Sequence, residues 1–167
     1  MVRLQMREGK GRVAQGATCL SRRKAIRYAR PVTESVAPSP VGDALERACA
    51  AARGALDKKA LEPVLLDVRN VTSYTDYILI VSGRSDRQVQ AIADGVLEAE
   101  RNIGVRPLGI EGDTGGQWIL IDFGDVVVHV FYHPVREFYD IEGLWNDVPR
   151  VKLEVPEEAR IPAEASY

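Results

Sequence analysis

The chain has 167 residues, of which 46% are hydrophobic, enough for one domain with a buried core. Its net charge of −2 is distributed unevenly along the chain. Residues 1–40 carry nine basic and two acidic side chains (net +7), whereas residues 41–167 carry thirteen basic and twenty-two acidic side chains (net −9). An acidic body disfavours direct sequence-specific binding of nucleic acid, which needs clustered Lys and Arg, and no apolar run is long enough to span a membrane.

Residues 1–40 are rich in Arg, Gly, Ser and Pro and show no hydrophobic period, which predicts a basic, disordered extension. An Arg-rich, acid-poor segment is also typical of an organellar presequence. We therefore expect a cytoplasmic bacterial protein, with an organellar location as the alternative. The two cysteines, Cys19 and Cys49, lack metal-ligand spacing and are expected to be reduced.

Residues 41–150 are predicted to form one α/β (α+β) domain, a mixed sheet of about five strands packed by helices. Asp43 is the expected N-cap of the first helix, and Ser85 and Gln88 form a capping-box pattern before the second, which Gly104 ends. In chain order, the pattern predicts a helix at 43–59, strands at 64–68 and 77–81, a helix at 85–104, strands at 105–110, 117–123 and 126–132, and a helix at 134–145. Residues 151–167 are predicted to be a loose, Glu/Pro/Ala-rich tail.

The strongest local signal is Gly124-Asp125 between two apolar runs, which predicts a β-hairpin with a two-residue turn. That turn sets the register and sorts the side chains into two faces. One face is apolar and is expected to be core: Ile119, Ile121, Phe123, Val126, Val128 and Val130. The other pairs Trp118 with Phe131, Leu120 with His129, and Asp122 with Val127, a mixture that suits a binding surface better than a catalytic cleft.

Trp118 is the leading candidate on this mixed face, because Trp is enriched at the centres of protein interfaces. The alternative is a half-buried Trp that a helix covers. His129 is expected to hydrogen-bond an acidic neighbour, with Asp122 as the candidate. His129 and His133 on one strand would lie about 13 Å apart at about 3.3 Å per residue, which excludes a shared metal ion.

Five segments of the chain resemble the ribosomal silencing factor family (RsfS, Iojap-related), in the order and at the spacing of that family. They are residues 75–83 (TDYILIVSG), 87–94 (RQVQAIAD), 109–112 (GIEG), 118–131 (WILIDFGDVVVHVF) and 139–145 (YDIEGLW). Together they extend over the whole predicted domain.

The resemblance implies a nucleotidyltransferase-like core without known catalysis. It also implies a factor that docks on a ribosomal protein at the intersubunit face of the large subunit and blocks the small subunit when nutrients are scarce. Such a factor needs no cofactor. The family's docking motif falls on Trp118, Leu120, Asp122, Phe123 and His129, and Phe131 shares the face of Trp118. Further candidates for partner binding are Asp76, Tyr77, Glu111 and Tyr139.

Two other functions stay open. A nucleotidyltransferase-like enzyme would bind NTP and Mg²⁺ through Asp122, Asp125 and the loop 82–85, but no Asp-x-Asp pair follows that loop, and turn chemistry explains Gly124-Asp125. The Gly-rich link 112–116 lacks the Lys-Ser/Thr of a P-loop. A dimeric assembly module would instead bring the Trp118 faces of two copies together. We expect a translational repressor, not an enzyme.

Overall fold

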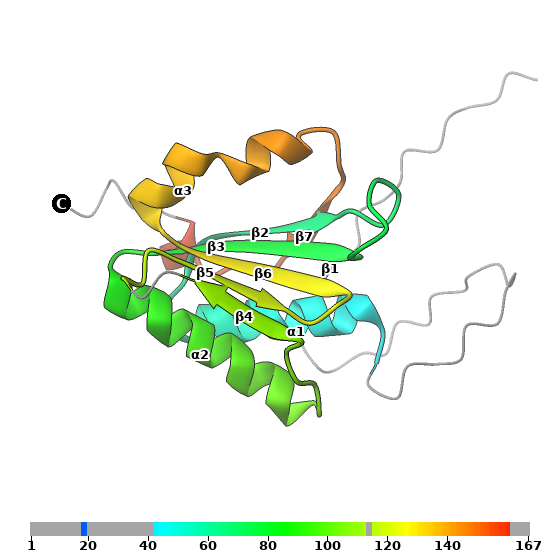
Figure 1. Ribbon diagram of the computed structural model, residues 1–167, viewed down its shortest axis with the longest axis horizontal. Coiled ribbons are helices and arrows are strands. Elements are labelled where there is room, and N and C mark those ends of the chain that lie inside the picture. The colour runs from blue at the N-terminus through cyan, green and yellow to red at the C-terminus, as the bar shows by residue number, and fades with distance from the viewer. Residues whose placement is uncertain (1–17, 20–41, 113–114, 161–167) are drawn as a thin grey trace, which may run out of the picture.

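The computed structural model describes residues 18–19, 42–112 and 115–160, and it forms three layers (Figure 1). A sheet lies in the middle, with two helices on one face and a third on the other. The helices are α1 (Ala44–Asp57), α2 (Asp86–Asn102) and α3 (His133–Tyr139), with short 3₁₀ helices η1 (Ile141–Trp145) and η2 (Glu157–Ala159). The strands are β1 (Thr18–Cys19), β2 (Leu61–Asp67), β3 (Tyr77–Gly83), β4 (Gly109–Gly112), β5 (Trp118–Asp122), β6 (Val126–Tyr132) and β7 (Arg150–Leu153).

The sheet is mixed, with the strand order β1-β7-β2-β3-β6-β5-β4. Its central pair, β3 and β6, is parallel, and so is the edge pair β1 and β7, while the other neighbours are antiparallel. The predicted α/β class and the mixed sheet with packed helices are therefore confirmed. The sheet has two strands beyond the five expected, β1 and β7.

Strand β7 corrects the prediction of a loose tail from residue 151. Val151 pairs with Leu65 of β2, and further on Ala159 of η2 is buried. The strand has only four residues, two of which are exposed charged side chains. The Glu and Pro residues that follow it therefore dominate the composition of residues 151–167. A prediction from composition therefore fails for residues 151–160, while 161–167 lie outside the described residues.

The basic extension also departs from prediction where it is described. Thr18 and Cys19 form β1, which pairs with Lys152 and Leu153 of β7, whereas the rest of residues 1–40 lies outside the described part. Backbone pairing at an open strand edge requires no hydrophobic pattern, so the sequence carries no signal for it.

Cys49 is disulfide-bonded, which contradicts the expected reduced state. A disulfide depends on close approach in space, which residue spacing does not report.

Helix α2 begins and ends much as the sequence predicts. The Ser85 hydroxyl accepts a hydrogen bond from the Gln88 N–H (3.2 Å). The reciprocal bond of the capping box differs, because the Gln88 side-chain oxygen accepts from Arg84 rather than Ser85 (2.8 Å). Gln88 also donates to the Lys59 carbonyl, which ties the helix start to the end of α1. At the other end, Gly104 adopts φ +83°, a left-handed conformation that closes the helix.

Two apolar clusters fill the spaces between the layers. Helices α1 and α2 cover one face of the sheet, and α3 with η1 covers part of the other (Figure 1). Strand β3 is buried throughout because both of its faces are covered. The larger cluster includes Leu65, Leu79, Val81, Val89, Ile92, Ile121 and Val128, and the smaller one includes Leu66, Ile78, Ile80, Phe131 and Val148.

The predicted last helix, 134–145, is interrupted at Asp140. This residue has φ 41° and ψ 50°, a left-handed conformation that ends α3, and its side chain accepts a hydrogen bond from the Gly143 N–H at the start of η1 (3.3 Å). Few residues other than Gly adopt this conformation, and Asp is among those that do. The break changes which side chains of the segment face the sheet.

Glu100 of α2 is fully buried, and within the described residues neither of its carboxylate oxygens has a hydrogen-bond partner. Burial raises its pKa from 4.5 to about 7, against the opposing charge of Arg47. The folded state therefore holds a proton that the unfolded state has released between these values, so this group makes stability fall as the pH rises from about 4.5 to 7.

We expect Glu100→Gln to remove that pH dependence and to stabilise the protein at pH 8 by on the order of 3 kcal/mol. Urea unfolding at pH 5 and pH 8 measures both effects. Glu98, which is exposed and pairs with Lys58 on the surface, provides the control: Glu98→Gln should change stability little at either pH. Equal stability of the wild type and Glu100→Gln at pH 8 would contradict the expectation.

Candidate functional site

The hairpin of β5 and β6 has the register that its two-residue turn predicts. Trp118 lies opposite Phe131, Leu120 opposite His129, and Asp122 opposite Val127. The apolar face packs into the cluster beneath α1 and α2, as expected. The mixed face points to the other side of the sheet, where, among the described helices, α3 and η1 lie (Figure 1).

Helix α3 and η1 cover only part of that side. Val135, Ile141 and Trp145 pack against the buried cluster on β2, β3 and β6. Trp118 touches the margin of this cluster, and Leu120 stays half-exposed further along β5. On the edge strand β4, Glu111 is exposed opposite Leu120. We call the uncovered area formed by Trp118, Leu120, Asp122 and Glu111 the strand face.

Trp118 is held by side chains from two other elements. Its ring stacks on Phe131 of β6, with 5.1 Å between centroids, and meets Tyr139 of α3 at 5.2 Å. Its indole N–H donates a hydrogen bond to Nδ1 of His129 (3.2 Å). An aromatic side chain fixed in this way loses little conformational freedom on binding, a property that favours affinity.

His129 is suited to accept that bond. Burial lowers its pKa to about 4, so the imidazole is neutral at pH 7, and its proton lies on Nε2 when Nδ1 accepts. The predicted bond between His129 and Asp122 is wrong. Asp122 instead accepts a hydrogen bond from the Gly124 N–H (2.7 Å), because the carboxylate lies beside the turn and reaches its backbone.

The structure separates the other candidates into three groups. Phe131 is fully buried and Phe123 lies in the core, so neither offers surface to a partner, and Phe131 acts as support for Trp118. Tyr77 is also buried, beneath the guanidinium of Arg69, and burial raises its pKa to about 12. Asp76 lies at the turn end of the hairpin, where its N–H donates to the carbonyl of residue 125. Tyr139 adjoins Trp118 and is exposed.

Sequence reasoning missed two exposed apolar side chains, Phe138 and Leu144, which were expected to belong to a helix packed on the sheet. They are 83% and 78% exposed. The left-handed Asp140 between them breaks the helical period, so Ile141 and Trp145 face the sheet while Leu144 does not. An Asp followed three residues later by Gly is the only local sign of this break.

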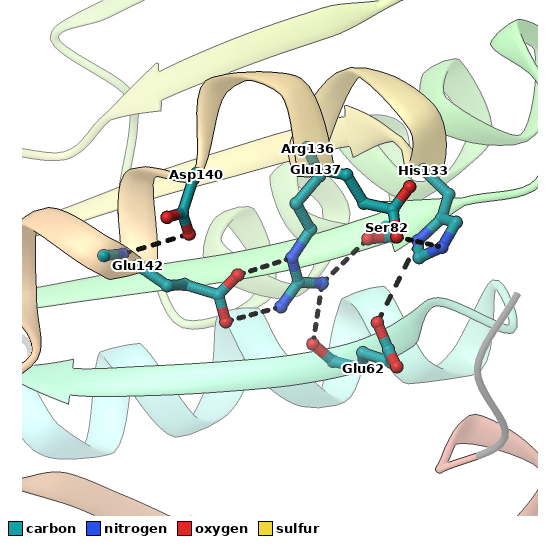
Figure 2. A network of polar contacts seen from close by, with 8 residues as sticks. Glu62, Ser82, His133, Arg136, Glu137, Asp140 and Glu142 are labelled. Atoms are coloured by element: carbon teal, nitrogen blue, oxygen red, sulfur yellow. Dashed lines mark hydrogen bonds and ion pairs between the residues drawn. The ribbon is translucent and has the colours of Figure 1, made fainter.

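Sequence reasoning also missed a polar network beneath these side chains (Figure 2). The buried Arg136 of α3 makes two hydrogen bonds to the carboxylate of Glu142 in η1 (2.8 and 2.9 Å). Its third nitrogen donates to the Ser82 hydroxyl of β3 (2.7 Å) and to the Glu62 carbonyl of β2 (2.9 Å). Arg136 therefore joins α3 and η1 to two strands of the sheet. His133 lies between the carboxylates of Glu62 and Glu137, at 3.9 and 3.8 Å.

The residues that suggested an enzyme have structural contacts of their own. Ser82 is buried against Arg136, and Asp125 forms an ion pair with Arg47 of α1. Within residues 42–112 and 115–160, no group of three or more His, Cys, Asp or Glu side chains is arranged to hold a metal ion. In the same described part, no helix is both long and apolar enough to cross a membrane.

Comparisons with known proteins agree on one family. Residues 42–166 match the family model "Ribosomal silencing factor during starvation". A ribosomal silencing factor from Halalkalibacterium halodurans is 43% identical over 98 residues, which are 59% of this chain and 84% of that protein. A crystal structure of a Chromobacterium violaceum protein superposes with a TM-score of 0.61 at 35% identity and covers 74% of this chain and 98% of its own.

A more distant mouse relative, named "Mitochondrial assembly of ribosomal large subunit protein 1", is 35% identical over 76 residues, which are 44% of this chain and 33% of that protein. The family model extends over most of the chain, including the strand face, α3 and η1. The predicted resemblance is thereby confirmed, and the chain belongs to the ribosomal silencing factor family.

Proposed function

We propose that this protein represses translation when nutrients are limited. It binds the large ribosomal subunit at the intersubunit face through a ribosomal protein and sterically prevents the small subunit from joining. Family membership supports the silencing role, and the name of the mouse relative supports the large subunit as its target. Binding alone suffices for such a block, so the function requires no catalytic residue and no cofactor.

The observation that carries the docking proposal is Trp118 on the uncovered strand face. A large aromatic ring that is fixed by neighbours and left accessible at one side has the properties of an interface hot spot. Leu120 adds apolar area beside it, and Glu111 and Asp122 add negative charge. We assign direct contact with the partner to these four side chains and to Tyr139, and a supporting role to His129 and Phe131.

The charge of the body supports a basic partner. Residues 41–167 carry a net −9, and most ribosomal proteins must be basic to neutralise ribosomal RNA. Complementary charge speeds association and suppresses wrong partners. We assign docking to residues 41–150 and propose the bacterial cytoplasm as the location, with an organelle as the alternative.

The proposal is tested by sedimenting the full chain with isolated large subunits and by measuring subunit joining with light scattering. We expect the protein to pellet with large subunits but not small ones, and to reduce joining in proportion to occupancy. If the protein stays in the supernatant, or joining proceeds unchanged at saturation, the proposal is wrong. Titration calorimetry with NTP and Mg²⁺ tests the enzyme alternative, and analytical ultracentrifugation of the free protein tests the dimer.

A further inference from the structure

The segment formed by α3 and η1, residues 133–145, exposes large apolar side chains that the fold does not need. Phe138, Tyr139 and Leu144 are 83%, 50% and 78% exposed. Single exposed apolar residues are ordinary, but Phe138 and Tyr139 are in contact and Leu144 lies on the same segment, and such a concentration marks an interaction site. We call this segment the arm.

The exposed rings of the arm continue directly into the strand face. Phe138 meets Tyr139 edge to face, with 5.3 Å between centroids, and Tyr139 meets Trp118 at 5.2 Å. The three rings therefore form an unbroken row from β5 to the outer surface of α3. A partner that contacts Trp118 and is wide enough to bury Tyr139 also reaches Phe138.

The arm is fixed before any partner arrives. On its inner side, Arg136 binds Glu142, Ser82 and the Glu62 carbonyl (Figure 2). Ile141 and Trp145 pack against the buried cluster on the sheet. Asp140 closes the turn between the two helical pieces. Ordering of side chains and loops is a main cost of association, and a rigid arm avoids most of it.

The charge around the exposed rings selects the partner. Glu137 and Asp140 flank Phe138 and Tyr139 along the chain and are exposed, whereas the charge of Glu142 is neutralised by Arg136. An apolar group with an acidic rim is complementary to an apolar pocket with a basic rim. The partner proposed for the strand face is likewise a basic protein that receives an apolar side chain.

We propose that the arm is the second half of the docking surface: Phe138 and Leu144 insert into an apolar, basic-rimmed pocket of the same ribosomal protein that receives Trp118. This inference rests on the proposed function and enlarges its site. The strand face and the arm meet at the pair formed by Trp118 and Tyr139.

The test compares Phe138→Ala with Tyr74→Ala in the full chain, using sedimentation with isolated large subunits. Tyr74 is the matched control, because it is 63% exposed, aromatic and located before the first residue of β3, at the opposite end of the parallel pair β3 and β6 from Tyr132, after which α3 begins. Circular dichroism should show wild-type folding for both variants. We expect Phe138→Ala to raise the Kd at least about tenfold and Tyr74→Ala to leave it unchanged.

Three results would overturn the inference. If Phe138→Ala binds as the wild type does, the arm is not part of the contact, while the proposed function stands. If Phe138→Ala instead dissociates a homodimer of the free protein without weakening subunit binding, the occupant is a second copy. If the wild type itself fails to bind large subunits, the proposed function and this inference are both wrong.

Discussion

Trp118→Ala is expected to weaken binding to the large subunit by at least about 2 kcal/mol, roughly a thirtyfold rise in Kd, while the protein stays folded. The truncation removes the ring where the strand face meets the arm, and Tyr139 loses its contact with the indole. Subunit joining should recover at concentrations at which the wild type blocks it. Sedimentation and light scattering with isolated subunits measure the two effects.

Trp118→Phe separates the two properties of this side chain. It keeps a ring for stacking on Phe131 and Tyr139 but removes the N–H that donates to His129. We expect an intermediate loss of affinity, because the orientation of the ring is then less restricted. Wild-type affinity in Trp118→Ala would show that the strand face is not the site, whatever its effect on stability.

Arg136→Met is expected to destabilise the fold by about 3–5 kcal/mol, the usual result of removing one partner from a buried ion pair. Glu142 then loses its hydrogen-bonded cation and keeps only the weaker influence of Arg150, and Ser82 and the Glu62 carbonyl lose their donor. Burial by itself raises the pKa of Glu142, but the hydrogen bonds and charge of Arg136 outweigh burial and lower it. A lowered pKa contributes stability above the unfolded pKa and loses it as the pH falls through the folded value.

The control is Arg69→Met, since Arg69 also makes two side-chain hydrogen bonds to a carboxylate, that of Asp67, but lies at the surface. Its loss should cost only about 1 kcal/mol. The double variant Arg136→Met/Glu142→Leu should regain much of the lost stability, because it leaves no buried charge. Urea unfolding at pH 7 measures all three. Equal losses for Arg136→Met and Arg69→Met would mean that the buried network does not hold the arm.

The hairpin shows which structural features the sequence alone predicts. A two-residue turn allows only one register, so the pairing of Trp118 with Phe131 and of Leu120 with His129 follows from Gly124-Asp125 alone. Which cross-strand neighbours bond to each other is not determined in this way. His129 accepts from Trp118, whereas the Asp122 carboxylate accepts from the backbone N–H of Gly124 in the turn.

The arm shows where sequence reasoning fails. The pattern predicts one unbroken helix over residues 134–145, with most of the apolar area of Tyr139, Ile141, Leu144 and Trp145 packed on the sheet. A single left-handed residue, Asp140, interrupts that helix, and a non-glycine residue in this conformation has only weak local signals. Strand β7 was missed for a related reason, because four residues are too few for a clear alternation.

The contacts of Arg136 have a consequence for the order in which the protein assembles. The guanidinium binds Ser82 and Glu62, which precede it by 54 and 74 residues, so the arm reaches its position only after β2 and β3 have paired. Contacts that close such long loops form late in folding. A chain released early from synthesis, or one locally unfolded at the sheet, therefore lacks the complete surface, a difference that amide hydrogen exchange at the arm would register. We therefore expect a chain in which β2 and β3 have not paired to lack the proposed docking surface and not to bind a ribosome.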